Sequence, residues 1–228
     1  MLSDAKIVNI REILGIAPVI PVLTVSDIEY AVPLAQALAG GGLRVLEITL
    51  RTPIALAAVA AMRKAVPEAI IGAGTLTRAT DFAAADQAGA QFGVTPGLTS
   101  ELAAAARSVR FPLLPGVMTP TDLITAREAG FNVLKLFPAQ QAGGIGMLQA
   151  LGAPFPDVQF CPTGGITRAG AADYLALPNV ISVCGSWVAP MHMIASGNWS
   201  AIEALARDAA SLTRSYKHPA ERCIGNSP

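Results

Sequence analysis

Histidine and cysteine are scarce in this chain of 228 residues, which contains two histidines and three cysteines. His192 and His218 form no HxH or HExxH pattern, and no two cysteines have the CxxC spacing. Because a catalytic zinc site takes several His, Cys or carboxylate ligands, metal-dependent chemistry is disfavoured. The odd, small number of cysteines (Cys161, Cys184 and Cys223) indicates reduced thiols in a cytoplasmic protein.

Charge is also sparse, since charged residues make up 14% of the chain and 16 basic residues balance 16 acidic ones. No run of five or more basic residues occurs, which excludes the electrostatic signature of a protein that binds nucleic acid or a membrane surface. No apolar segment reaches the length of a membrane span, and no charged region at the N-terminus leads into an apolar one. A soluble, unexported protein is therefore expected.

Hydrophobic residues are abundant at 52%, although only 5% of residues are aromatic, so aliphatic side chains must fill a large core. Short apolar runs alternate with helical patterns. The expected strands cover residues 16–22, 43–50, 70–75, 91–95, 111–115, 132–138, 158–162 and 180–184. The expected helices cover residues 3–14, 27–38, 77–88, 102–108, 120–129, 148–151, 168–176 and 199–214. Another helix is expected to begin near Pro53, with this proline as its first residue. Ser3 or Asp4 is expected to cap the first helix.

Eight strand–helix units in a chain of this size predict an α/β fold, a single (β/α)8 TIM barrel with an extra N-terminal helix. We expect residues 1–228 to form one domain, with the barrel core at about 16–214 and a loose C-terminal tail at 217–228. An open doubly wound sheet is the structural alternative. That fold would usually carry GxGxxG or a P-loop after its first strand, and neither is present.

The strand expected at residues 132–138 carries a lysine among apolar residues. Strand parity puts Val133, Lys135 and Phe137 on one face, where the amine cannot easily reach water. Because a charged ammonium is costly to bury, such an amine tends to become neutral, and a neutral amine can form a Schiff base with a carbonyl substrate. The alternatives are that Lys135 reaches outward to water or pairs with a carboxylate in a purely structural role.

The second expected strand offers a partner for this lysine. Glu47, Thr49 and Arg51 share one parity, which directs them into the barrel or to its rim, while the leucine and isoleucine face packs on helices. A carboxylate inside the same barrel as Lys135 can shuttle protons around a Schiff base, with Glu47 as acid and base. The alternative for Glu47 is a buried structural ion pair with Arg51 or Lys135.

Two further residues are expected at the C-terminal ends of the strands, where barrels of this class have their active sites. Arg51 could hold a substrate carboxylate through its guanidinium, or it could be a surface arginine in a loop. Thr75 follows Gly72 and Gly74 and would face the mouth. The small residues beneath it either leave room for a ligand or relieve crowding between a helix and the sheet.

Glycine-bearing loops follow the last two expected strands, at residues 163–165 and 185–186. Barrels frequently bind a phosphate at this place through backbone N–H groups and a helix N-terminus. A single Gly-Gly pair is usually just a tight turn, whereas two such loops at these strand ends favour an anion site. The ligand inferred from the residues has a carbonyl group, a carboxylate and a distal phosphate.

Seven short motifs, in order and at the expected spacing, carry a resemblance to a known family. They are EITLRT at residues 47–52, GAGT at 72–75, TPG at 95–97, LPG at 114–116, KLFPA at 135–139, PTGG at 162–165 and GSW at 185–187. From about residue 16 to residue 212 the chain resembles the 2-keto-3-deoxy-6-phosphogluconate (KDPG) aldolases, which also act on 4-hydroxy-2-oxoglutarate. Thr95, Leu136, Gln140 and Cys184 depart from the residues common in that family.

The resemblance implies a metal-independent class I aldolase without a cofactor, usually a homotrimer, that acts in the Entner–Doudoroff pathway. Such a carbon–carbon lyase cleaves KDPG to pyruvate and glyceraldehyde 3-phosphate. By motif position, Lys135 would form the Schiff base and Glu47 would move protons. The remaining substrate-binding positions would be Arg51 and Thr75 for the carboxylate, Pro96 and Phe137 around it, and Thr163, Gly164, Gly165 and Ser186 for the phosphate.

Three other functions stay open. An aldolase for the galactonate epimer of KDPG would differ in its preference at the C4 hydroxyl. A phosphosugar isomerase or epimerase on the same barrel would use Glu47 as base and Lys135 only electrostatically. A non-catalytic barrel that binds phosphorylated metabolites would bind without cleavage, and the co-location of Lys135 and Glu47 argues against it.

Overall fold

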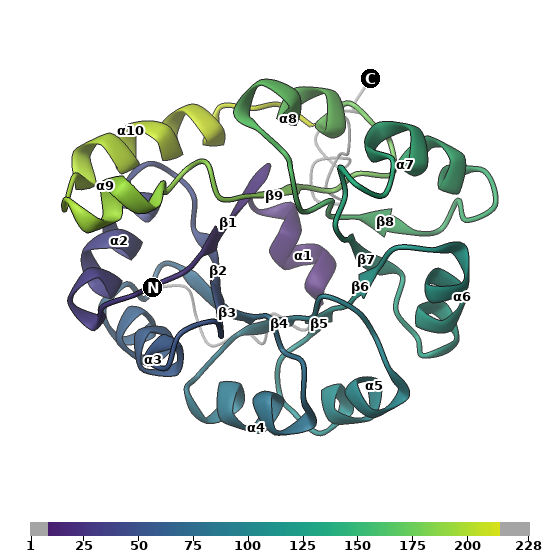
Figure 1. Ribbon diagram of the computed structural model, residues 1–228, viewed down its shortest axis with the longest axis horizontal. Helices are drawn as coiled ribbons and strands as arrows, with labels where there is room; N and C mark the ends of the chain where they lie inside the picture. Colours follow the sequence, from purple (N-terminus) through teal and green to yellow (C-terminus); the bar gives the residue numbers. More distant parts are fainter. Residues whose placement is uncertain (1–8, 215–228) are drawn as a thin grey trace, which may run out of the picture.

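The computed structural model describes residues 9–214, which form a ring of parallel strands surrounded by helices (Figure 1). The strands are β1 (Val19–Leu23), β2 (Val45–Thr49), β3 (Ile70–Gly74), β4 (Phe92–Val94), β5 (Leu113–Leu114), β6 (Gly116–Val117), β7 (Val133–Leu136), β8 (Gln159–Phe160) and β9 (Val183–Gly185). Their pairings are parallel and give the orders β5-β4-β3-β2-β1-β9 and β6-β7-β8.

Backbone hydrogen bonds close these two sheets into one barrel. β5 and β6 are the two halves of the fifth barrel strand, divided by Pro115, which has no N–H to donate to a ladder. Its carbonyl oxygen still accepts from the Lys135 N–H at 2.8 Å. On the other side, the Cys184 N–H donates to the Pro162 carbonyl at 2.9 Å and joins β8 to β9. The predicted (β/α)8 barrel is therefore confirmed.

Helices cover the outside of the ring in Figure 1. They are α2 (Ile28–Gly40), α3 (Ala55–Ala65), α4 (Ala79–Gln87), α5 (Ser100–Arg107), α6 (Pro120–Glu128), α7 (Gly144–Gly152), α8 (Arg168–Leu175), α9 (Met191–Ala195) and α10 (Trp199–Ala210). Most begin at side-chain caps, such as Asp27 for α2 and Thr167 for α8, which accept from free N–H groups of the first turn. Within residues 9–214 no helix has the length and apolar character needed to span a membrane.

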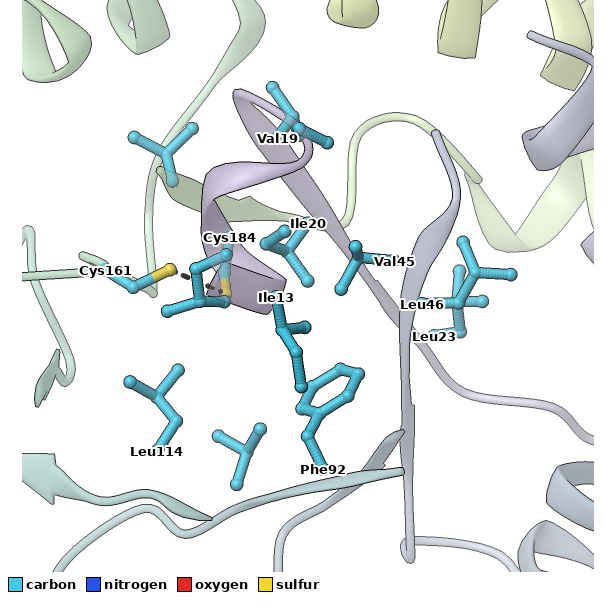
Figure 2. Close-up of a cluster of buried hydrophobic side chains, with 14 of the residues drawn as sticks. Ile13, Val19, Ile20, Leu23, Val45, Leu46, Phe92, Leu114, Cys161 and Cys184 are labelled. Carbon is cyan, nitrogen blue, oxygen red and sulfur yellow. Dashed lines mark hydrogen bonds between the residues drawn. The ribbon is translucent and has the colours of Figure 1, made fainter. Parts of the chain in front are cut away.

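The short helix α1 (Ile10–Gly15) is seen inside the ring when the barrel is viewed end-on (Figure 1). Its Arg11 side chain donates to Gln159, the first residue of β8, so α1 closes the N-terminal end of the strands. Ile13 and Leu14 are fully buried, and Figure 2 shows Ile13 among the inward side chains of the barrel. The predicted extra helix is thus the floor of the barrel.

Several predicted helix ends are wrong, for local reasons. The cap of α1 is Asn9, whose side chain accepts from the Arg11 N–H; Ser3 and Asp4 lie outside the described residues. Ile16 caps the end of α1 in a helical conformation, so β1 begins at Val19, not at residue 16. Pro53 is not the first residue of α3, which begins two residues later at Ala55.

The end of the chain also differs from the prediction. The last helix stops at Ala210 rather than 214, because Ser211 caps it and its hydroxyl bonds the Asp208 carbonyl. The short helix α9 was not predicted. The tail at 217–228 lies outside the described residues, and the single-domain assignment of residues 1–228 stays a prediction.

Two inward glycines on β3 set the packing inside the barrel. A Cβ on Gly72 would lie 2.4 Å from the ring of Phe92, and one on Gly74 would lie 2.2 Å from Oε1 of Glu47. The space beneath Thr75 is therefore filled by Phe92 and Glu47. Both expectations for these glycines, room for a ligand and relief of a helix, are wrong.

Candidate active site

Lys135 and Glu47 meet in the interior of the barrel. Lys135 projects from β7 and Glu47 from β2, and Nζ of the lysine lies 3.4 Å from Oε1 of the glutamate. The lysine is 5% exposed and the glutamate 1%. The predicted co-location of an amine and a carboxylate is confirmed, and a lysine that reaches outward to water is excluded. Their catalytic roles stay predictions at this point.

Two of the predicted pocket residues border the amine. Nζ of Lys135 lies 5.3 Å from the centre of the Phe137 ring, so one side of the amine is apolar. Gly116 pairs with Lys135 in register, and a Cβ on Gly116 would be 2.3 Å from the Pro96 carbonyl oxygen. Pro96 therefore passes directly over Gly116, on the strand beside the lysine, and the Phe137 ring covers one side of Nζ.

A buried thiol approaches the other oxygen of Glu47. Sγ of Cys184 on β9 lies 3.9 Å from Oε2, and it also lies 3.4 Å from Sγ of Cys161 (dashed in Figure 2). Cys161 in turn lies 3.3 Å from Oγ of Ser182. The hydrogen bond with Cys161, together with burial, raises the pKa of the Cys184 thiol well above its usual range. Sequence reasoning missed this cluster, although the shared parity of Ser182 and Cys184 could have indicated it.

Two threonines lie above Glu47 towards the mouth. The Thr49 hydroxyl donates to the Leu23 carbonyl at 2.9 Å and lies 3.1 Å from the Thr24 hydroxyl. Because the single proton of Thr49 is used on Leu23, Thr24 must donate to Thr49, which leaves its own lone pairs as acceptors. Thr49 had the predicted inward parity, whereas Thr24 was not singled out from the sequence.

Thr75 has an unusual backbone. It follows β3 with a φ of 64°, the one positive φ of a non-glycine residue within 9–214. A β-branched residue in the left-handed region is a genuine outlier and costs of order 1–3 kcal/mol, which persists where the surrounding structure enforces it. Such strain clusters at ligand-binding sites, which supports the predicted role of this half-buried threonine.

Arg51 is exposed in the turn that follows β2, two residues beyond the buried end of the strand at Thr49. The structure places it at the C-terminal rim, as parity predicted. It does not form the buried ion pair with Glu47 that was one of the alternatives, since that carboxylate pairs with Lys135. Binding of a substrate carboxylate by Arg51 stays a prediction.

The predicted phosphate loops also lie at this rim. Gly164 and Gly165 have φ values of 104° and 75°, which turn the backbone into a left-handed bend that favours glycine. The Ala139 N–H donates to the Thr163 carbonyl and so ties this loop to the end of β7. Thr163 forms an isolated parallel β-bridge with Cys184, which lies two residues before the exposed Ser186. The loop is thereby brought beside the strand that carries Lys135.

Two cavities lie at the opposite end of the barrel, where the strands begin. One of about 300 Å³ is lined by residues such as Phe111 and Asn132, and one of about 700 Å³ by Arg11 and Gln159. These residues precede or begin their strands, whereas the predicted site residues lie at or beyond the strand ends. The predicted site residues instead gather at the mouth, where the Lys135 amine, the Glu47 carboxylate and the left-handed glycine turns converge.

Comparison with known proteins agrees with this geometry. A family model described as KDPG and KHG aldolase matches residues 10–205. The chain is 47% identical to a protein of Escherichia coli strain K12 named KHG/KDPG aldolase, over 87% of this chain and 93% of that protein. It is 44% identical to the 2-dehydro-3-deoxy-phosphogluconate aldolase of Pseudoalteromonas atlantica, over 90% and 95% of the two chains. It is also similar to a crystal structure of KDPG aldolase from Legionella pneumophila, with pyruvate captured as a covalent carbinolamine intermediate (TM-score 0.86, 44% identity, 88% and 98% coverage).

Proposed function

This chain belongs to the KDPG and KHG aldolase family, and we propose that it is a class I aldolase that cleaves KDPG to pyruvate and glyceraldehyde 3-phosphate. It also cleaves 4-hydroxy-2-oxoglutarate to pyruvate and glyoxylate. The observation that carries the proposal is the buried contact of 3.4 Å between Lys135 and Glu47. The captured carbinolamine in the Legionella relative supports a covalent route.

The reaction begins at the keto carbon of the substrate. Lys135 attacks this carbon as the free amine to form a carbinolamine, which takes up a proton as it loses water and so becomes a protonated imine. The imine withdraws electrons, so the C3–C4 bond can break and leave its electron pair in an enamine. The Phe137 ring beside Nζ and the burial of Lys135 restrict the water that would otherwise compete for the amine.

Glu47 is the proton carrier of this scheme. It accepts the proton of the C4 hydroxyl, directly or through a water, as the C3–C4 bond breaks. It then returns a proton to the enamine carbon, which becomes the methyl group of pyruvate once the imine is hydrolysed. Oε1 is 3.4 Å from the lysine nitrogen, which is bonded to C2 in the imine, so one carboxylate can serve both C3 and the C4 hydroxyl on the same side of that carbon.

The two ends of the substrate are held at the rim. Arg51 and Thr75 bind the carboxylate, the former through its guanidinium and the latter through a hydroxyl held by a strained backbone. The phosphate binds at the loop of Thr163, Gly164 and Gly165, together with Ser186. The left-handed φ values of both glycines support this assignment, because they allow close approach of the backbone to a ligand.

Borohydride reduction in the presence of pyruvate tests the function. We expect wild type to gain one reduced pyruvate adduct that peptide mapping places on Lys135, whereas Lys135→Ala gains none. Lys64→Ala is the matched control, because Lys64 is an exposed lysine near the end of α3 and is not one of the proposed site residues. Equal trapping by wild type and Lys135→Ala would refute the assignment. A phosphosugar isomerase would give no adduct at all.

Substrate preference and assembly need separate measurements. Relative turnover of KDPG and its galactonate epimer separates the proposed activity from that of an aldolase for the epimer. We propose a cytoplasmic homotrimer that acts in the Entner–Doudoroff pathway. Light scattering tests the assembly, since a trimer has three times the 23.4 kDa mass of one chain.

A further inference from the structure

A line of four buried polar side chains runs from the wall of the barrel to the carboxylate of Glu47. Ser182 Oγ, Cys161 Sγ, Cys184 Sγ and Glu47 Oε2 follow one another at 3.3, 3.4 and 3.9 Å. Glu47 lies on β2 and Cys184 on β9. Ser182 directly precedes β9, and Cys161 directly follows β8. All four residues are at most 1% exposed. In Figure 2 the two sulfur atoms lie within the cluster of buried hydrophobic side chains that includes Ile13, Ile20 and Leu114.

The position of the protons along this line follows from hydrogen-bond capacity. An ionised carboxylate only accepts, so Cys184 must donate its single proton to Glu47 when that residue is charged. The sulfur of Cys184 can then accept from Cys161, and the sulfur of Cys161 can accept from the Ser182 hydroxyl. Every proton therefore points towards Glu47. When Glu47 is protonated, its carboxyl group is a weaker acceptor, so the bond from Cys184 stabilises that form less than it stabilises the charged one.

The groups that face Glu47 from the neighbouring strands are few. Lys135 on β7 contacts Oε1, and Cys184 on β9 contacts Oε2. Val22 on β1 and Gly74 on β3 are adjacent to Glu47 and carry no titratable group. The thiol is thus the one neighbouring donor, among residues 9–214, that favours the charged carboxylate without being the nucleophile.

From this geometry we propose that Cys184 is a positioning residue of the aldolase, which holds Oε2 of Glu47 and favours its charged, proton-accepting form. The inference rests on the proposed function. With Oε2 held by the thiol, Oε1 is directed at Lys135 and at the substrate atoms bound to it. Cys161 supports this arrangement by donating to the sulfur of Cys184, and Ser182 does so by donating to the sulfur of Cys161.

The test measures how the rate of KDPG cleavage depends on pH. In Cys184→Ala the charged carboxylate loses a donor, so the acid limb of the kcat profile moves to higher pH, by about half a unit. Cys184→Ser, which keeps a donor, moves the limb back towards wild type. Cys161→Ala gives a smaller shift in the same direction.

A second readout isolates proton transfer from phosphate binding. Pyruvate alone forms the imine and enamine, so its methyl protons exchange with D2O at a rate that proton NMR measures. At the pH of the acid limb we expect exchange in Cys184→Ala to be about threefold slower than in wild type, which is the same half unit. The yield of borohydride adduct with pyruvate stays unchanged, because Lys135 is intact.

Ile20→Val is the packing control, because Ile20 is the register partner of Cys184 on β1 and lies in the same layer in Figure 2. It removes buried volume without removing a donor, and we expect no shift of the limb. The positioning role is overturned if the acid limb of Cys184→Ala does not shift, or if that of Ile20→Val shifts equally. The proposed aldolase function stands in either case, as long as wild type cleaves KDPG. If Cys184→Ala does not fold, Cys184→Ser and Cys161→Ala decide by the same comparison. Absence of cleavage and adduct in wild type would instead overturn the proposed function.

Discussion

The interior of the barrel has two layers of opposite character, built by the same strands. The layer next to α1 is apolar and includes Ile20, Val45, Phe92 and Leu114, against which Ile13 of α1 packs (Figure 2). The layer towards the mouth is buried as deeply but polar, and it includes Glu47, Thr49, Lys135 and Thr163. On β2 the change takes one step of two residues, from Val45 to Glu47. The close-packed lower layer provides the rigid base that a reactive upper layer needs.

The two glycines of β3 make the same comparison on one strand. Gly72 lies in the lower layer and gives its space to the ring of Phe92. Gly74 lies in the upper layer and gives its space to the carboxylate of Glu47. One missing side chain therefore serves packing, and the other serves the placement of a reactive group.

The largest expected effect is that of Glu47→Gln, which keeps the shape of the upper layer and removes its proton carrier. We expect kcat for KDPG cleavage to fall by about 10²–10⁴-fold, since general acid–base help is worth that much. Borohydride trapping of pyruvate persists, because Lys135 remains. A near wild-type kcat in steady-state assays would mean that another group moves the proton.

The glycine pair comes next, and it sets the two layers against each other with the same substitution. Gly74→Ala would place a Cβ 2.2 Å from Oε1 of Glu47, so the carboxylate must move and kcat falls by about 10²-fold. Gly72→Ala would press on Phe92, and overpacking of this kind costs about 1–3 kcal/mol of unfolding free energy. Urea unfolding and kcat are measured for both variants. If both lose activity and stability alike, the layers do not have separate roles.

A smaller effect is expected from the thiol that lies between the layers. The pKa of Cys184 is raised in the folded state, while the unfolded thiol ionises at about 8.5. Its contribution is therefore complete below about pH 8.5 and declines as pH rises towards the folded value, by up to about 1.4 kcal/mol per unit. Urea unfolding under reducing conditions measures it as the difference between wild type and Cys184→Ala. If the difference in unfolding free energy between the two proteins is constant from pH 7 to pH 10, the pKa of Cys184 is not raised by folding.

The smallest effect is expected at the rim, where Thr75 is strained. Thr75→Gly relieves the left-handed backbone, and we expect a gain of about 1 kcal/mol in unfolding free energy. The variant loses the hydroxyl, so more pyruvate is needed for half-maximal borohydride trapping. Thr75→Ser is the control, because it retains both the hydroxyl and most of the strain. A destabilised Thr75→Gly would show that the threonine side chain packs more tightly than its half-buried state implies.

The sequence predicts the barrel and its reactive pair well, because both depend on local patterns. Alternation of apolar runs and helices gives the fold, and strand parity alone places Glu47 and Lys135 inside. The caps at Asn9 and Ser211 are missed, since a helix end depends on whether a nearby side chain reaches a free backbone group. The split of the fifth strand at Pro115 is also missed.

Contacts between distant strands are harder to foresee. Cys161, Ser182 and Cys184 look like unremarkable strand residues, and only the stagger of β8 against β9 brings the two sulfur atoms together. Likewise, the roles of Gly72 and Gly74 depend on which neighbouring side chains lean over β3. Strand parity predicts whether a side chain points into the barrel. Which side chains it contacts there depends on the tilt and stagger of the strands in the closed barrel.

Because α1 closes one end of the barrel, the interior opens only at the C-terminal ends of the strands. In the proposed reaction the pyruvate half is bonded to Lys135 below the phosphorylated half, which lies nearer the rim. The aldehyde must consequently depart first and pyruvate last, through the same opening. In the synthetic direction the order is reversed, and an aldehyde that arrives before pyruvate would obstruct the entrance to the amine.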